Sequence, residues 1–170
     1  MVGNNAYLFK DITELAQHLL SLNKDLTPLR LQKSLYFLFA FYGASYGQLY
    51  VSSEEPEENV FEGTDEESYP KYLFPDKFEA WKFGPVNRDL YKKFKNKELI
   101  PKKWNPKTER EENINVLFQQ VLEEVDSMGD FELVDRTHDD RAWKDARTEM
   151  GDRPKEMDQE KIIEDYITYV

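Results

Sequence analysis

The chain has 170 residues, a formal net charge of −11, 39% hydrophobic and 14% aromatic residues, and no cysteine. A chain of this length can bury a core large enough to fold without cross-links, and the missing cysteines exclude a disulfide framework, a thiolate zinc site and a cysteine nucleophile. The acidic charge argues against sequence-independent nucleic-acid binding, because such binding needs a basic face that displaces counterions from the phosphates.

No stretch of the sequence has the pattern of a membrane anchor or a secretory leader. The longest apolar stretch, residues 35–44, is interrupted by aromatic residues and glycine and is much shorter than the ~20 residues that span a bilayer. We therefore predict one cytoplasmic domain over residues 1–170, with no membrane contact.

Two helices are predicted in the first third of the chain. Asp11 is positioned to cap a helix whose apolar stripe continues to Leu22. Thr27 and Pro28 are positioned to cap and begin a second helix that extends to about Tyr46. Because this second helix is apolar on nearly all sides, we expect it at the centre of the fold.

Three polar residues interrupt the apolar pattern of the second helix. Arg30, Gln32 and Lys33 are interpreted as solvated side chains of its first turns. The alternative is that Gln32 and Lys33 belong to a partner-binding cleft.

The segment at about residues 52–70 has a distinct composition. It contains eight acidic residues and no Lys or Arg. With few large apolar side chains, it is predicted to form a surface loop that follows a short strand at residues 49–51. Its acidity is interpreted as an aid to solubility, and the alternative is attraction of a basic partner.

The most informative stretch begins at Phe78. Residues 78–83 have the pattern of a strand with two partly apolar faces, and a hairpin with residues 72–74 is predicted. We expect Gly84 and Pro85 to end the strand, because proline has no amide for a ladder. Residues 86–95 follow as a basic amphipathic helix.

The C-terminal half adds further predicted helices. They cover about residues 108–128, a short segment from 131, a segment that contains Trp143, and residues 157–170. The predicted fold class is therefore mainly α, a compact single-domain helical bundle of five to seven helices with a small β-hairpin.

His138 is the most obvious catalytic candidate, since it lies among aspartates. A metal site would need further ligands at helical or hairpin spacing, and His18, the second histidine, is distant in the chain. No glycine-rich loop after a strand could cradle a phosphate. We therefore predict no catalytic residue, no metal and no cofactor, and we interpret residues 137–139 as a capping segment whose imidazole bonds backbone near Trp143.

Trp81 and Trp143 are interpreted as core residues. The alternative is that one of them lines a partner-binding cleft, because aromatic and arginine side chains form most interface hot spots. Arg88 follows the Gly84–Pro85 corner, where it is either a surface charge or an anchor for a carboxylate of a partner.

Three stretches resemble one known family. Residues 29–37 resemble its K-L-Q-K-L-L-Y-F helix, residues 78–86 its F-x-A-W-x-x-G-P-V corner, and residues 133–143 its L-S-x-x-T-H-x-x-x-x-W segment. The order and spacing of the three motifs, over roughly residues 11–147, are similar to the Panacea, or SocA-like, antitoxin domain of phage-associated proteins. This chain departs from the family's pattern at Arg30, Ser34 and Val134 and in the acidic insertion after Val51.

The resemblance implies a helical antitoxin that binds and neutralises a cognate protein toxin and is not an enzyme. The acidic charge of the chain favours a basic toxin. Two alternatives are an adaptor that delivers the toxin to a protease and a phage-borne protein that binds a host factor. The candidate partner-binding or motif-scaffold residues are Gln32, Lys33, Trp81, Gly84, Pro85, Arg88, Thr137, His138 and Trp143.

Overall fold

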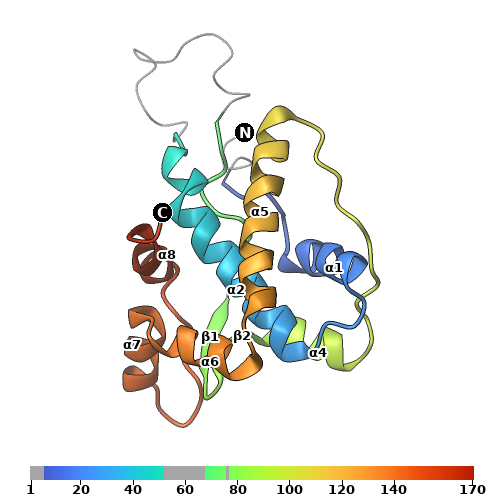
Figure 1. Cartoon of the computed structure of the whole chain (residues 1–170). Helices are drawn as coiled ribbons and strands as arrows, with labels where there is room; N and C mark the ends of the chain where they lie inside the picture. The colour runs from blue at the N-terminus through green and yellow to red at the C-terminus, as the bar shows by residue number, and fades with distance from the viewer. Residues whose placement is uncertain (1–5, 52–67, 76) are drawn as a thin grey trace.

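The computed structural model describes residues 6–51, 68–75 and 77–170, which form a mainly α fold with one small antiparallel sheet (Figure 1). This confirms the predicted fold class. The elements are α1 (Ile12–Leu22), α2 (Pro28–Ala44), the 3-10 helix η1 (Tyr46–Leu49), β1 (Phe78–Trp81), β2 (Gly84–Asn87), α4 (Arg88–Lys95), α5 (Glu109–Ser127), α6 (Asp130–His138), α7 (Arg141–Glu149) and α8 (Gln159–Ile167).

The long helices begin where side-chain caps satisfy their first amides. The Asp11 carboxylate accepts a hydrogen bond from the Thr13 amide at 2.7 Å, and the Thr27 hydroxyl accepts one from the Arg30 amide at 3.2 Å. Thr108 caps α5 in the same way. These caps are local in sequence, so the predicted starts of α1, α2 and α5 are confirmed.

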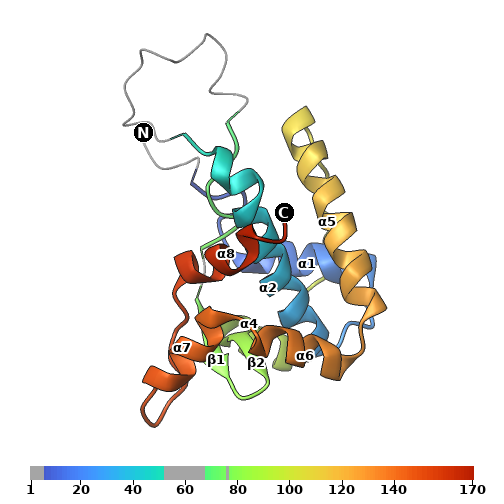
Figure 2. The ribbon, with the colours of Figure 1, turned by 60° about the vertical axis from the view of Figure 1, so that its left-hand side comes forward.

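Helix α2 forms the centre of the molecule, as predicted. It contacts α1, α5, α6, α8 and β2, and both ribbon views show it passing between them (Figures 1 and 2). Leu35, Tyr36 and Phe37, on three of its sides, are each at most 3% exposed. Burial of each such side chain contributes roughly 1.5–3 kcal/mol to folding.

The hairpin differs from the prediction. β1 pairs with β2, from Phe78 opposite Asn87 to Trp81 opposite Gly84, so the chain turns at residues 82–83 and Gly84 begins the second strand. The predicted pairing with residues 72–74 is wrong, since Tyr72 instead bridges Tyr7. The expected stop at Gly84–Pro85 is also wrong, because β2 is a sheet edge, where the missing proline amide leaves no ladder bond unmade.

The opposite edge of β1 is covered by the chain that leads into α8. The Ala80 amide donates to the Lys155 carbonyl at 2.8 Å, and the Met157 amide donates to the Phe78 carbonyl at 2.7 Å. β1 is therefore held on both edges, although its two neighbours, residues 84–87 and 155–157, are distant from each other in the chain.

A buried carboxylate joins three helices. Asp140, 3% exposed, accepts hydrogen bonds from the Tyr36 hydroxyl at 2.6 Å, the Tyr166 hydroxyl at 2.7 Å and the Arg136 guanidinium at 3.1 Å. Burial raises the pKa of Asp140, and these three donors oppose that shift. The network ties α2, α6 and α8 together through one residue between α6 and α7.

Three further predictions need correction or fall outside the described residues. The strand expected at 49–51 is replaced by η1, which ends at Leu49. The last helix is shorter than predicted, since it covers Gln159–Ile167, and Ile167 and Val170 are 41% and 61% exposed. Apart from residues 68–70, the predicted acidic loop lies outside the described residues.

Membrane crossing can be assessed for each helix in the described ranges. None of these helices combines the length and the apolar character that a bilayer span requires.

Candidate partner-binding site

The hairpin of β1 and β2 lies between α2 and the α6–α7 pair (Figure 2). β2 contacts α2, α4 and α6, whereas β1 contacts α7. The candidate residues from three distant stretches therefore meet around one hairpin. They are Gln32 and Lys33 of α2, Trp81 of β1, Gly84 and Pro85 of β2, Arg88 of α4, Thr137 and His138 of α6, and Trp143 of α7.

Gly84 is required by both its backbone angle and its surroundings. Its φ of 109° is in the region that residues with a side chain avoid. A Cβ atom at this position would lie 2.6 Å from Thr137 Oγ1 and 2.7 Å from Lys33 Cε. The glycine thus lets Lys33 of α2 and Thr137 of α6 both approach the hairpin closely.

Gln32 acts as a side-chain partner for the free edge of β2. Its amide nitrogen donates to the Asn87 carbonyl at 3.0 Å, and its amide oxygen accepts from the Asn87 amide at 2.9 Å. The Asn87 side chain in turn caps α4 by accepting from the Leu90 amide at 3.0 Å. Gln32 is 4% exposed, so its interpretation as a solvated residue is wrong.

Lys33 is buried under the hairpin and is 2% exposed. Its ammonium group donates to the Pro85 carbonyl at 3.2 Å, and no carboxylate of the described residues lies within ion-pair distance. Burial lowers the pKa of Lys33 to about 8. The sequence could not show this burial, because the covering atoms come from residues 84–85 and Thr137.

Three side chains of α6 and α7 form hydrogen bonds with backbone carbonyls of the hairpin. His138 Nε2 lies 3.0 Å from the Lys82 carbonyl, the Trp143 indole donates to the Trp81 carbonyl at 2.9 Å, and Arg147 donates to the Ala80 carbonyl at 3.0 Å. Since a carbonyl only accepts, His138 carries its proton on Nε2.

The imidazole also stacks on the Trp143 ring, with 4.0 Å between the ring centroids. His138 therefore bonds backbone beside Trp143, as expected from the sequence, but the backbone belongs to the hairpin turn.

The outer side of the hairpin carries an ordered aromatic–arginine group. Arg88 donates to the Glu79 carboxylate at 2.8 and 3.2 Å, and the Trp81 indole donates to the same carboxylate at 2.9 Å. The Arg88 guanidinium lies 5.1 Å from the Trp81 ring centroid. Burial by itself would raise the pKa of Glu79, but these hydrogen bonds outweigh burial and hold that pKa below its ordinary value.

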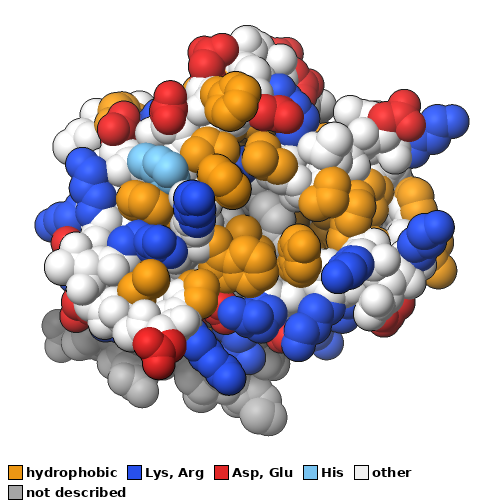
Figure 3. Space-filling model, turned by 90° about the horizontal axis from the view of Figure 1, so that it is seen from below, with side chains coloured by type: hydrophobic (Ala, Val, Ile, Leu, Met, Phe, Trp, Pro, Cys, Tyr) orange, Lys and Arg blue, Asp and Glu red, His pale blue; other side chains and the backbone are white. Residues whose placement is uncertain are grey.

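The aromatic–arginine group continues onto an exposed surface, which we call the hairpin face. It consists of Trp81, Lys82, Phe83, Arg88, Tyr91, Lys92 and Lys95. Phe83 at the turn is 61% exposed and Tyr91 on α4 is 37% exposed. Figure 3 views the molecule from the hairpin end and shows apolar side chains gathered near the centre, with Lys and Arg beside them and Asp and Glu mostly at the rim.

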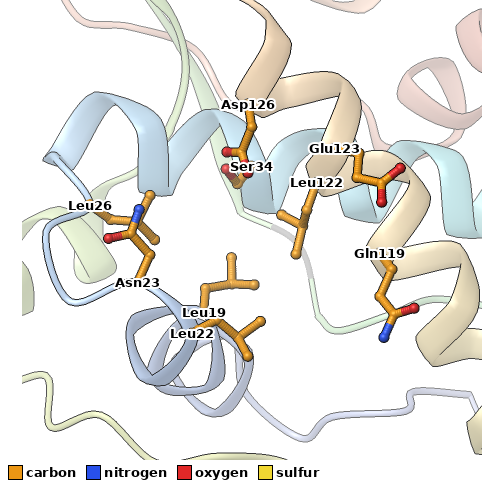
Figure 4. A pocket seen from close by; sticks show the side chains of 9 residues that line it. All are labelled: Leu19, Leu22, Asn23, Leu26, Ser34, Gln119, Leu122, Glu123 and Asp126. Atoms are coloured by element: carbon orange, nitrogen blue, oxygen red, sulfur yellow. The ribbon is translucent and has the colours of Figure 1, made fainter.

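A pocket of about 290 Å³ lies elsewhere, between α1, α2 and α5. Figure 4 shows leucine side chains from α1 and α5 facing each other across it, with Ser34 of α2 and the carboxylates of Glu123 and Asp126 at its edge. These groups do not converge on one point and include no histidine or cation, so the pocket has no evident chemistry.

Metal binding was a further possibility for the aspartates around His138. Among the residues that the structure describes, no group of three or more His and acidic side chains is placed to hold a metal ion. Asp140 is engaged by two tyrosines and an arginine.

Residues 61–144 match the family model for the antitoxin SocA-like, Panacea domain. This part of the chain is similar to the Panacea domain. The match includes both hairpin strands and α4, α5 and α6, so it covers the candidate residues from Trp81 to Trp143. No curated protein and no solved structure matches the chain.

The match confirms the resemblance seen at residues 78–86 and 133–143. The stretch at 29–37 precedes the matched residues of the Panacea domain, yet the structure packs it directly against the hairpin. Sequence reasoning missed Glu79, Asn87, Tyr91 and Arg147 as neighbours of the site. Only Asn87 had a local signal, as a capping residue before a helix.

Proposed function

We propose that this protein is a cytoplasmic antitoxin that neutralises a cognate protein toxin by binding it directly. The observation that carries the proposal is the match of residues 61–144 to the antitoxin SocA-like, Panacea domain. An antitoxin of this kind would act by covering the working surface of the toxin, so it would need a preformed docking surface and no chemistry of its own.

The arrangement around the hairpin supports a binding role without catalysis. The side chains of His138, Trp143 and Arg147 all bond carbonyls of the hairpin. One polar atom of each side chain therefore helps to hold a surface element in place.

The test is co-expression with the product of the adjacent open reading frame. We expect that product to arrest growth alone, growth to recover when this protein is present, and the two proteins to copurify. A neighbour that is harmless alone and forms no complex would refute the proposal.

The same experiment separates two modes of action. Neutralisation by occlusion leaves the amount of toxin unchanged, whereas an adaptor lowers the amount only in cells that contain the protease. A host protein in the pull-down, with no toxin gene adjacent, would indicate a phage-borne inhibitor instead.

A further inference from the structure

We infer that the hairpin face is the docking surface for an acidic segment of a partner protein, one in which apolar or aromatic side chains stand between carboxylates. The choice of surface and the chemistry of the segment rest on the geometry below. The identity of the partner as a toxin rests on the proposed function.

The first argument is the group of aromatic rings at the surface. Trp81 and Tyr91 lie with their ring centroids 5.3 Å apart, and Phe83 extends from the turn beside them with 61% of its surface exposed. Strand β1, the turn that follows it and helix α4 thus present three aromatic rings. Such rings supply large contact area at little cost in conformational entropy, which is why they dominate interface hot spots.

The second argument is the set of cations around these rings. Arg88, Lys92 and Lys95 lie at the spacing of one helix face with Tyr91, and Lys82 lies 5.5 Å from the Phe83 ring centroid. Lys82, Lys92 and Lys95 have no carboxylate within ion-pair distance among the described residues. Each is free to pair with a carboxylate that approaches from outside.

The third argument is the contrast between this face and the rest of the molecule. Residues 77–103 carry nine Lys and Arg against three Asp and Glu, in a chain of net charge −11. An acidic segment is attracted here and repelled over most of the remaining surface. The same charges therefore select both the site and the orientation of the partner.

Cations beside aromatic rings also suit single-stranded nucleic acid, which contributes stacking bases and phosphates. A nucleic acid strand carries its charge along its whole length, so beyond the hairpin face it would meet the acidic body of this protein. A short protein segment carries its charge only where the cations are. The charge distribution favours the protein segment.

The hairpin face is also held in place before any partner arrives. The Trp81 indole is fixed by Glu79, the Trp81 carbonyl by Trp143 and the Lys82 carbonyl by His138. Few side chains of the hairpin face need to become ordered when a partner binds, so little affinity is lost to conformational entropy.

A peptide titration tests the surface without knowledge of the partner. Nitrogen-15-labelled protein is titrated with a short peptide of Glu and Asp interrupted by two Phe, with the same peptide bearing Lys in place of each acid, and with oligothymidylate. We expect the acidic peptide to shift the Trp81 indole signal and the amides of residues 82–95, and neither control to do so. No shift, shifts elsewhere, or equal shifts with oligothymidylate would overturn the inference.

A matched pair of double variants tests the surface against the partner itself. Phe83→Ser with Lys92→Glu changes the hairpin face, and Val116→Ser with Lys24→Glu makes comparable apolar-to-polar and charge-reversing changes at exposed sites elsewhere. We expect the first pair to weaken binding of the copurified toxin by at least about tenfold and the second to leave it nearly unchanged. Far-ultraviolet circular dichroism and thermal melting confirm that both variants fold.

The antitoxin role and the docking role of the hairpin face can each be refuted independently of the other. If the adjacent gene product binds equally well to both variants, the antitoxin role stands and the hairpin face is not the interface. If the acidic peptide maps to the hairpin face while the adjacent product is harmless and does not bind, the surface stands and the antitoxin role does not.

Discussion

At the residue scale, the hairpin depends on Gly84 and Lys33, which meet beneath it. Gly84 has the positive φ and the close neighbours described above, whereas Lys33 contributes a buried ammonium group with one carbonyl partner. Gly84 allows the arrangement because it has no side chain to clash with Thr137 and Lys33. Burial of Lys33 opposes folding, because an ammonium ion loses its hydration on burial.

Gly84→Ala is expected to lower the free energy of unfolding by roughly 2–4 kcal/mol, from backbone strain together with overpacking against Thr137 and Lys33. Gly151→Ala is the matched control, since a Cβ there meets no atom within 4 Å, and it should change stability by less than about 0.5 kcal/mol. Urea unfolding followed by circular dichroism measures both. Equal effects of the two variants would contradict this account.

Lys33 predicts a particular pH dependence. Its pKa is about 8 in the folded protein against 10.5 for the ordinary group, so the unfolded chain binds the extra proton between these values. The Lys33 contribution to stability is therefore most favourable above pH 10.5 and falls by roughly 3 kcal/mol as the pH decreases to 8, below which it is constant.

Lys33→Met removes this titration while keeping similar volume. The difference in unfolding free energy between the variant and the parent should grow in favour of the variant as the pH is lowered from 10 to 8. Lys24→Met, at an exposed position, should show a flat difference. A flat difference for Lys33→Met as well would mean that the ammonium group is hydrated in the folded protein.

At the element scale, the packing of α2, α6 and α8 depends on Asp140. The tyrosine hydroxyls of α2 and α8 and the Arg136 guanidinium all point to one carboxylate. The hairpin in turn is held by side chains from α2, α6 and α7, so the relative placement of the helices sets the geometry of the hairpin face.

Asp140→Ala should destabilise the protein by roughly 3 kcal/mol, because it leaves two buried hydroxyls and a half-buried guanidinium without their acceptor. Asp139→Ala is the control at the neighbouring exposed position and should cost less than about 0.5 kcal/mol. Thermal or urea denaturation gives the comparison. A similar small effect of both changes would show that water replaces the carboxylate.

At the scale of the whole molecule, two charge patterns make opposite predictions about the partner. The net charge of −11 favours a basic partner, whereas the hairpin face favours contact with an acidic segment. The two are compatible only if long-range steering and short-range docking act on different parts of the partner.

Replacing the eight acidic residues between positions 52 and 70 by Asn or Gln leaves a formal net charge of −3. If docking of the acidic segment limits the rate, association with the partner should accelerate severalfold at low salt, and the difference should shrink above about 0.3 M salt. Stopped-flow mixing measures the rate constants. Slower association of the variant would instead indicate a partner that is basic overall.

The sequence predicted most of the helical framework. Caps at Asp11, Thr27 and Thr108 act on amides within three residues, so a local pattern is sufficient to reveal them. It did not predict the hairpin pairing, because the choice between residues 72–74 and 84–87 as partner of β1 depends on the space that α2 and α6 leave.

The sequence by itself determined the fold class, the central helix and the family resemblance, since each depends on local pattern or on motif order. Only the tertiary structure decided that Gln32 and Lys33 are buried and that residues from three distant stretches surround one hairpin. It also decided that the aromatic and cationic side chains of that hairpin form one exposed face. The reason is that burial and proximity are set by atoms distant in the chain, and these positions are not encoded in any local pattern.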